Sequence, residues 1–293
     1  MSKIYNDVTI LIVTYKSEKI IFQAIKNFNK KFNIIVCENS SNMFFKNLIE
    51  KKYSNTKVVL TGDNLGVSKA VNIGLKKIKT KFVFWVSPDT LLNKNCLKKI
   101  YNCIRQKPNT AIVAPINLDR KLKNYGYFQN FLTSRNVEVV NHLKYKYVDW
   151  VLGVAWLMDV KKISKIGFFD ENFFLDFEEM DVCFRFRNKN FNIVISLDAF
   201  VISKPAQSVN ANKNHLSRQR MWHYGWSSFY FYKKNYSFFY SLISNSNIFF
   251  INLIKMIYHL VLFDSNKFLN YFYYISGFVC SVLRVKSYLR KNL

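Results

Sequence analysis

Acidic side chains are concentrated in one short segment of this 293-residue chain, Asp176–Asp181, which contains four of them. A hydroxyl group that attacks a carbon atom must lose its proton, and a carboxylate within hydrogen-bond distance can accept it as a general base. Glu179 is one candidate for this role. Asp176 followed three residues later by Glu179, ahead of a helical pattern, is also the spacing of a capping box, in which Glu179 folds back onto the backbone. Both interpretations stay open, and under the second one Asp181 or Glu178 would be the base.

Two other features could recognise a nucleotide. Glu38 follows a short apolar segment, where its carboxylate could accept a hydrogen bond from the imide N–H of a base; the ordinary alternative is a solvated loop acid. Asn64 and Gly66 precede a segment of helical periodicity, whose first backbone N–H groups could approach a diphosphate. An Asn/Gly turn that caps this helix is compatible with the same role.

These side chains stand at the ends of predicted strands. In the first half of the chain, continuous apolar segments alternate with segments of helical periodicity, which indicates a parallel sheet covered by helices on both faces. Ligands on such sheets bind beyond the carboxyl ends of the strands. Ser17 is the predicted N-cap of the first helix. The predicted strands are Val8–Val13, Phe32–Cys37, Lys57–Thr61, Phe82–Val86 and Thr110–Ala114, and further helices cover about 67–78 and a segment with Leu97, Ile100 and Ile104.

A series of motifs at these strand ends follows a fixed order. They are Thr14-Tyr15 after the first strand, VCENSS at 36–41, DNLGVSKAVNIG at 63–74, SPDT at 87–90, GFFDE at 167–171 and FLDFEEMDVCFR at 174–185. Over about residues 7–235 this series resembles the family 2 glycosyltransferases, including rhamnosyltransferase-like members. The resemblance implies the GT-A fold, an α/β fold with a mostly parallel, Rossmann-like sheet. It also implies transfer of a sugar from a nucleoside-diphosphate donor to a hydroxyl group, with inversion at the anomeric carbon.

The resemblance further implies roles for individual residues. Glu179 occupies the position of the general base, where Asp is usual, and Asp181 is a second catalytic candidate in the same motif. Asp89 is the implied ligand of a divalent cation, Mg²⁺ or Mn²⁺, which would neutralise the leaving diphosphate. From the residues alone, Asp89 could instead cap the next helix after a Ser-Pro-Asp turn. The implied nucleotide-sugar-binding residues are Thr14, Tyr15, Glu38, Asn64, Gly66 and Lys204.

The implied metal site departs from the family pattern in two ways. The usual Asp-x-Asp element is reduced to the single Asp89, and Lys204 stands where family members often have a histidine. His215 lies eleven residues further on and could substitute for that histidine. A lysine at position 204 could itself neutralise the diphosphate. We therefore expect weak, donor-dependent metal binding.

The chain is strongly basic, with 44 Lys+Arg against 18 Asp+Glu and a net charge of +26. The basic residues are mostly scattered lysines, without an Arg-rich block, a helix-turn-helix or a zinc finger, so we expect no nucleic-acid partner. The excess is greatest from Lys204 onward, where Asp264 is the only acid among many aromatic residues. Basic and aromatic side chains on amphipathic helices suit an anionic membrane surface. We therefore predict a GT-A domain over 1–208 and a helical, membrane-associating region over 209–293.

Composition and pattern exclude several other classes. Half of the residues are apolar, which excludes global disorder. Neither a Gly-x-Gly-x-x-Gly motif nor a P-loop occurs, and the five Cys indicate neither a disulfide framework nor a zinc site. The N-terminus lacks the pattern of a signal peptide, and no run of about 18 uncharged apolar residues occurs. We therefore expect a cytoplasmic protein, peripheral on the inner face of the cell membrane.

This location favours a lipid-linked acceptor, such as a polyprenyl-diphosphate-linked saccharide of a growing surface glycan. Two rival functions stay open. A nucleotidyltransferase would have the same fold, but the chain lacks the glycine-rich, basic N-terminal loop that such enzymes use to bind a triphosphate. The other rival is a non-catalytic membrane- or nucleic-acid-binding protein on a degenerate GT-A fold.

Overall fold

The computed structural model describes residues 2–28, 30–118, 127–128, 144–203 and 213–287. Its internal contacts divide it into two compact units. Unit 1 contains residues 1–64, 69–169 and 179–210, and unit 2 contains residues 65–68, 170–178 and 211–293. The predicted domain boundary at residue 208 lies outside the described residues.

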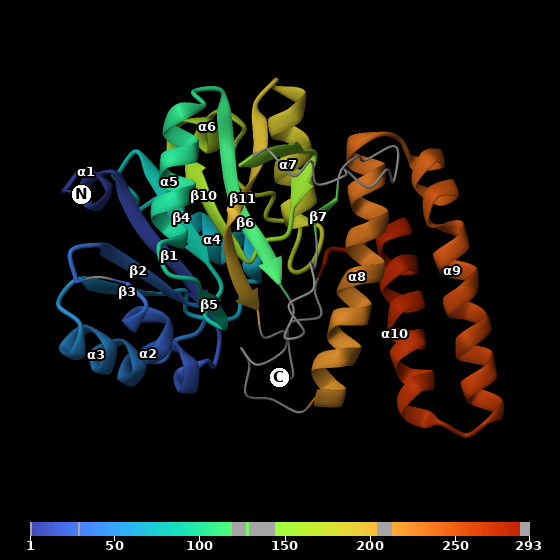
Figure 1. The fold of residues 1–293 in the computed structure, drawn as a ribbon. Coiled ribbons are helices and arrows are strands. Elements are labelled where there is room, and N and C mark those ends of the chain that lie inside the picture. Colours follow the sequence, from blue (N-terminus) through green and yellow to red (C-terminus); the bar gives the residue numbers. More distant parts are fainter. Residues whose placement is uncertain (1, 29, 119–126, 129–143, 204–212, 288–293) are drawn as a thin grey trace. The chain divides into compact units, whose positions relative to one another are not determined.

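A nine-stranded sheet forms the centre of unit 1 (Figure 1). Its strands are β1 (Val8–Thr14), β2 (Asn33–Glu38), β3 (Thr56–Leu60), β4 (Phe82–Val86), β5 (Thr90–Leu92), β6 (Thr110–Leu118), β8 (Tyr145–Val148), β10 (Ala155–Asp159) and β11 (Asn192–Ser203). The order is β3-β2-β1-β4-β10-β6-β11-β5, and β8 pairs with β11. A separate pair consists of β7 (Tyr127–Phe128) and β9 (Trp150–Val151).

Strand direction differs between the two halves of this sheet. Strands β3, β2, β1 and β4 are parallel neighbours, as the alternating sequence pattern predicts. Strand β10 lies antiparallel between β4 and β6, and β11 is antiparallel to β5 and β8 but parallel to β6. The sheet is therefore mixed. The predicted mostly parallel sheet is confirmed. The antiparallel place of β10 was not predicted, because strand partners are set by long-range packing that a local pattern does not contain.

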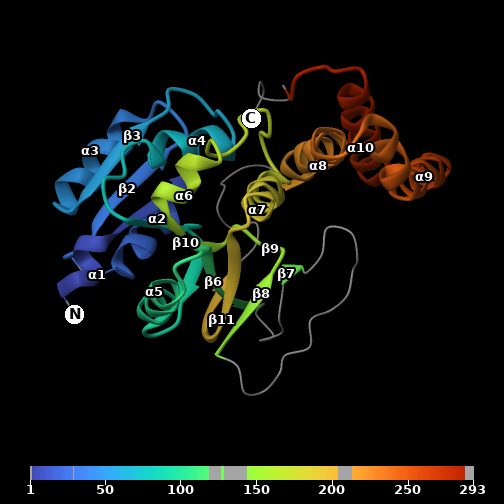
Figure 2. The ribbon, with the colours of Figure 1, turned by 90° about the horizontal axis from the view of Figure 1, so that it is seen from above.

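Helices cover both faces of this sheet (Figure 2). On one face, alternate apolar residues of β1 join the buried side chains of α2 (Glu18–Lys26), α3 (Met43–Lys52) and α5 (Cys96–Gln106) in one core cluster. On the other face, α4 (Val67–Leu75) approaches β1 so closely that a Cβ on Gly74 would overlap the side chain of Leu11. The remaining helices of this region are α1 (Ser2–Asp7), α6 (Val160–Lys165) and α7 (Glu178–Asn188).

The start of α2 differs in detail from the prediction. Ser17 does precede the helix, but its Oγ donates a 3.0 Å hydrogen bond to the carbonyl of Tyr15 and makes no side-chain cap contact. The backbone carbonyl of Ser17 instead accepts from Ile20 and Ile21. Ser17 therefore occupies the predicted N-cap position, but its hydroxyl closes the turn that leads out of β1 and does not cap the helix.

Unit 2 contains the helices α8 (Lys213–Asn235), α9 (Phe238–Val261) and α10 (Ser265–Val282), which lie side by side in Figures 1 and 2. The side chains of Ser237 and Asp264 accept hydrogen bonds from backbone N–H groups in the first turns of α9 and α10. The predicted C-terminal helical region is confirmed. Within the described ranges, no helix is both long and apolar enough to cross a membrane.

Glycine allows α8 and α10 to pack backbone against backbone. A Cβ on Gly277 would overlap the carbonyl oxygen of Trp222, and a Cβ on Gly225 would overlap that of Tyr274. Contact this close is possible only where no side chain separates the two helices. These two glycines therefore fix the α8–α10 pair.

Candidate functional site

The end of β2 carries a buried carboxylate, so the solvated alternative for Glu38 is wrong. Glu38 is only 2% exposed and lies opposite Thr14 in the β1–β2 register. Its Oε1 accepts a 2.8 Å hydrogen bond from Ser40 Oγ, while Oε2 is buried without a hydrogen-bond partner among the described residues. Burial raises the pKa of Glu38 to about 7, although hydrogen bonds from Ser40 and the Lys16 backbone N–H oppose that rise. Oε2 can therefore accept a hydrogen bond from a ligand N–H group.

The residues that end β1 lie next to this carboxylate. The carbonyl of Thr14 accepts a 2.7 Å hydrogen bond from the backbone N–H of Asn39, which joins the ends of β1 and β2. Thr14 Oγ1 is buried and has no hydrogen-bond partner in the described part of the chain. Tyr15 is half-buried, and Lys16 Nζ lies 5.3 Å from the centroid of its ring. The structure thus brings Thr14 and Glu38 together at one edge of the sheet, as predicted from the order of the strands.

A hydrogen-bond network positions Asn64. Asn39 Nδ2 donates to Asn64 Oδ1 at 2.9 Å, and Thr61 Oγ1 donates to Asn39 Oδ1 at 3.1 Å. The backbone N–H of Asn64 donates to Asp63 Oδ1 at 2.7 Å. Asn64 is therefore held at the ends of β2 and β3, beside the residue that follows Glu38.

Gly66 belongs to unit 2 and has a backbone reason to be glycine. Its φ is +82°, and a Cβ there would lie 2.5 Å from the carbonyl oxygen of Phe174. The neighbouring N–H of Val67 donates to that same oxygen at 2.8 Å. A side chain at position 66 would break this contact at the start of α4.

Asp89 lies in the turn between β4 and β5. Thr90 donates its N–H to the Ser87 carbonyl at 3.2 Å, and the following helix, α5, begins only at Cys96. The alternative in which Asp89 caps the next helix is therefore wrong. Across the described residues, no group of three or more His, Cys, Asp or Glu side chains could hold a metal ion. Asp89 alone fits a cation that takes most of its other ligands from water and from phosphate oxygens.

Glu179 lies in the first turn of α7. The helix begins at Glu178, and the preceding residues Asp176 and Phe177 have φ values of +64° and +68°. Asp176 is therefore two residues ahead of the helix in a left-handed conformation, so the capping-box interpretation is wrong. Glu179 is half-buried.

A glycine that the sequence analysis did not single out makes room for Glu179. A Cβ on Gly153 would lie 2.7 Å from both Cγ and Oε1 of Glu179 and 2.8 Å from the ring of Trp85. The Glu179 side chain thus rests against the backbone that precedes β10, near the end of β4. Nothing in the local sequence around Gly153 indicates this contact, because 26 residues separate it from Glu179.

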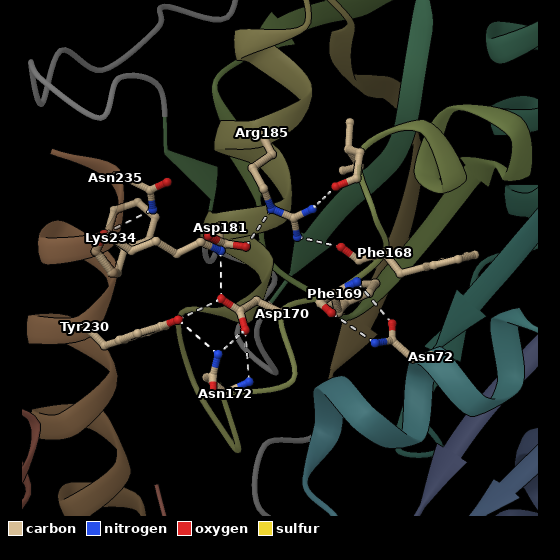
Figure 3. Close-up of polar contacts among 12 residues, drawn as sticks. Asn72, Phe168, Phe169, Asp170, Asn172, Asp181, Arg185, Tyr230, Lys234 and Asn235 are labelled. Atoms are coloured by element: carbon tan, nitrogen blue, oxygen red, sulfur yellow. Dashed lines mark hydrogen bonds and ion pairs between the residues drawn. The ribbon is translucent and has the colours of Figure 1, made fainter. Parts of the chain in front are cut away.

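Asp181 occupies a different environment from Glu179. It is fully buried and pairs with Arg185, whose Nε lies 2.8 Å from Asp181 Oδ2. The same guanidinium donates to the carbonyls of Ile166 and Phe168, both at 2.6 Å (Figure 3). Arg185 thus holds the backbone of residues 166–168, which precede Asp170 of the GFFDE motif. Burial and pairing favour a positioning role for Asp181 over the predicted catalytic one.

A second acidic centre lies within unit 2. Asp170 Oδ2 is 2.8 Å from Lys234 Nζ and accepts a 3.0 Å hydrogen bond from Tyr230, while Oδ1 accepts from the backbone N–H of Asn172 at 2.9 Å (Figure 3). Burial alone would raise the pKa of Asp170, but the contacts with Lys234, Asn172 and Tyr230 outweigh it and the pKa is lowered. Asp170 therefore ties the 170–178 loop to α8. Its place in the GFFDE motif was the only sequence signal for it.

Two of the predicted positions stay untested. Lys204 lies outside the described residues. His215, the suggested substitute for the family histidine, is half-buried on α8 in unit 2.

The sequence matches the family model for Glycosyl transferase family 2 over residues 9–187. The chain belongs to this family. It is 26% identical over 199 residues to the low-salt glycan biosynthesis hexosyltransferase Agl10 of Haloferax volcanii, covering 64% of each protein. It is 27% identical over 190 residues to the dTDP-rhamnosyl transferase RfbF of Shigella flexneri, covering 61% of this chain and 62% of that one. The match thus spans less than two thirds of either relative's length.

Solved structures support the same fold. The mannosyltransferase PcManGT from Pyrobaculum calidifontis, in complex with GDP-Man and Mn²⁺, has a TM-score of 0.57 at 13% identity and covers 95% of this chain and 87% of its own. GalNAc-T7 with UDP, GalNAc and Mn²⁺ has a TM-score of 0.56 at 12% identity and covers 82% of this chain and 56% of its own. The family and the GT-A fold predicted from the motifs are confirmed.

Proposed function

We propose that this chain transfers a sugar from a nucleoside-diphosphate donor to a hydroxyl group of a glycan acceptor. The observation that carries the proposal is the place of Glu179, half-buried in the first turn of α7 against Gly153, at the base position of a family 2 motif. The acceptor oxygen forms a bond to the anomeric carbon and gives its proton to Glu179. The bond from that carbon to the donor phosphate breaks, and the nucleoside diphosphate leaves. Attack from the opposite face inverts the anomeric carbon.

Glu38 favours one class of donor base. Its buried Oε2 can accept a hydrogen bond, and uracil, thymine and guanine each present a ring N–H beside a carbonyl. Adenine and cytosine lack that ring N–H in their usual forms. The names of the relatives include dTDP, and the similar structures hold UDP and GDP-Man. We therefore assign the donor to the uridine, thymidine or guanosine class, with Thr14, Tyr15 and Asn64 around the base and ribose.

The leaving diphosphate needs positive charge. Asp89 would hold a divalent cation together with phosphate oxygens of the donor, and such a cation stabilises the charge that develops on the leaving group. Both similar structures contain Mn²⁺. Lys204 would supply further positive charge, and Gly66 would allow the backbone at the start of α4 to approach a phosphate.

Chelation with EDTA tests the role of Lys204. Turnover that survives EDTA in the parent and is lost in Lys204→Ala would support a role of the lysine in neutralising the diphosphate. Complete loss of turnover in the parent, restored by Mn²⁺, would contradict that role.

We propose that the acceptor is anchored in a membrane. Both relatives are glycan-synthesis or rhamnosyl-transfer proteins by name. The net charge of +26 and the aromatic C-terminal helices suit an anionic membrane surface. We propose a polyprenyl-diphosphate-linked saccharide of a surface glycan as the acceptor, at the cytoplasmic face of the cell membrane.

Turnover assays test this function. Purified chain is incubated with UDP-, dTDP- and GDP-sugars, and release of the nucleoside diphosphate is measured with and without lipid-linked acceptor. Release that is lost in Glu179→Gln and kept in Glu50→Gln, a variant of an acid on α3, would support the proposal. Oligonucleotide or vesicle binding without turnover of any nucleotide-sugar would instead support the non-catalytic alternative.

A further inference from the structure

Helix α9 exposes many of its apolar side chains, while others, such as Phe249, pack against α10. Six of the exposed side chains recur at helical spacing and are between 52% and 74% exposed, and we call this set the outer stripe: Phe239, Ile243, Phe250, Ile254, Ile257 and Val261. The buried residues of the same helix are polar, namely Ser241, Asn245 and Asn252. A surface helix of a protein in water shows the opposite pattern, with apolar residues inside and polar residues outside.

Each buried polar side chain of α9 makes a hydrogen bond inside unit 2. Ser241 Oγ donates to the carbonyl of Phe229 at 2.7 Å, and Asn245 Nδ2 donates to the carbonyl of Ser241 at 2.8 Å. Asn252 Nδ2 donates to the carbonyl of Ile248 at 2.7 Å. Polar side chains turned inward and bonded to protein are what an apolar environment outside the helix requires.

The stripe continues into the turn between α9 and α10. Leu260, Leu262 and Phe263 are 56%, 54% and 94% exposed. Phe263 also has a φ of +54°, a left-handed conformation that a bulky residue rarely adopts. The turn thus presents the large ring of Phe263 to the outside, on a backbone conformation that is sterically unfavourable for this residue. Stripe and turn form one continuous apolar surface.

Charge identifies the partner of this surface as a membrane. Residues 211–293 carry eleven Lys and Arg residues and one acid, Asp264, so phosphate headgroups of anionic lipids complement this region. A second copy of the chain would bring the same positive charge against it. A helix with one apolar face and basic residues around it lies along a membrane surface, with the apolar face inserted.

We propose that the outer stripe and the α9–α10 turn insert into the hydrocarbon of one leaflet of an anionic membrane. The inference rests on the proposed function only for the presence of a membrane. It deepens that proposal, because electrostatic attraction alone would leave the apolar side chains in water. Insertion places α9 parallel to the membrane surface, with its polar face toward the protein.

Flotation with vesicles tests the insertion on the full chain. Vesicles are made of phosphatidylcholine alone or mixed with phosphatidylglycerol, and sodium chloride is varied. We expect binding to both kinds, stronger with the anionic lipid, and part of it to survive about 0.5 M salt, at which surface charges are screened. The triple variant Ile254→Asn, Ile257→Asn, Val261→Asn should bind at least about tenfold more weakly to both. A matched control is Met43→Asn, Phe44→Asn on α3, where both side chains are also exposed.

Measuring how deeply a side chain enters the bilayer distinguishes loss of insertion from a structural disturbance of unit 2. Tryptophan at Ile254→Trp should be quenched by lipids brominated in the acyl chain, and tryptophan at Phe44→Trp should not. Binding that salt abolishes entirely, or that the triple variant leaves unchanged, would overturn the inference. So would sedimentation showing that the stripe forms a dimer and that the dimer does not bind vesicles.

These measurements use neither donor nor acceptor, so they separate the two proposals. Loss of sugar transfer with vesicle insertion intact would contradict the proposed function alone. Sugar transfer to a water-soluble acceptor by a chain that does not insert would contradict the insertion alone.

Discussion

Units 1 and 2 distribute polar and apolar side chains in opposite ways. In unit 1, every residue of β4 is buried, and the carboxylates of Glu38 and Glu179 stand at the ends of a strand and a helix. In unit 2, α9 buries Ser241 and Asn245 and exposes isoleucine and phenylalanine. The first arrangement is stable in water and concentrates its chemistry at an edge of the sheet. The second fits the proposed contact with an apolar medium, so the two proposals together assign catalysis to unit 1 and membrane binding to unit 2.

The variant Glu179→Gln tests most directly whether unit 1 carries out sugar transfer. Glutamine keeps the shape of the side chain beside Gly153 but accepts no proton, so we expect kcat for sugar transfer to fall by roughly 10²–10⁴-fold with little change in donor affinity. Transfer is measured by release of nucleoside diphosphate, and donor affinity by calorimetry.

Asp181→Asn provides the contrast to that variant. Because Arg185 would lose its buried partner, Tm should fall, whereas Glu179→Gln should leave Tm unchanged. A folded Glu179→Gln enzyme with most of its activity would move the base to Glu178 or Asp181.

Matched truncations compare the two units directly. Phe84 of β4 is fully buried, while Phe250 of α9 is 58% exposed. Phe84→Ala should lower the free energy of unfolding by about 3–5 kcal/mol through a cavity in the core. Phe250→Ala should change it by no more than about 0.5 kcal/mol in water. Urea titrations followed by circular dichroism measure both. Equal losses of unfolding free energy in the two variants would mean that Phe250 is packed in water like Phe84, and would contradict the contrast between the two units.

Local pattern predicted most of unit 1. Strands β1 to β4 and helices α4 and α5 were found from apolar runs and helical periodicity, which depend on neighbouring residues only. Helix α3 was not predicted, because only Phe45 and Ile49 of its residues are buried and Met43 and Phe44 face outward. The antiparallel place of β10 was not predicted either, since strand order depends on contacts between distant segments.

The candidate site was predicted in position but not in environment. Glu38 ends β2, Asp89 follows β4 and Glu179 lies in the first turn of α7. The buried Oε2 of Glu38 and the contact of Glu179 with Gly153 come from packing between segments far apart in the chain. The sequence predicted a membrane-associating region over 209–293 but not which side chains of α9 are exposed, because that depends on how α9 packs against α8 and α10.

Glu38 in unit 1 and Asp170 in unit 2 should give the stability of the protein opposite responses to pH. The folded-state pKa of Glu38 in unit 1 is raised to about 7, mainly by burial. Its contribution to stability is therefore full below the pKa of the unfolded chain and is lost as pH rises through about 7. Glu38→Gln removes this dependence, so the variant should gain roughly 1–3 kcal/mol on the parent between about pH 5 and 8. Chemical unfolding at each pH measures the difference, and parallel curves would contradict it.

The same carboxyl should make donor binding depend on pH. An ionised Glu38 accepts a hydrogen bond from a base N–H better than a protonated one, so UDP, dTDP or GDP should bind more tightly as pH rises from about 6 to 8. Calorimetry on the parent and Glu38→Gln measures this change; ADP serves as the control ligand. Tight binding of ADP would contradict the assignment of the donor base.

The smallest effect is expected at Asp170 in unit 2. Its folded-state pKa is lowered, so its contribution to stability is present at neutral pH and is lost as pH falls through that lowered value. Lys234→Met removes the cation 2.8 Å from Asp170 and should cost about 1 kcal/mol near neutral pH, and less below the lowered pKa. Lys233→Met, one residue earlier on α8, is the control. Hydrogen exchange of residues 170–178 reports the loop itself, which should exchange faster in Lys234→Met because Tyr230 and Asn172 alone would then hold Asp170. Unchanged exchange in that segment would mean that Lys234 contributes surface charge and no anchoring.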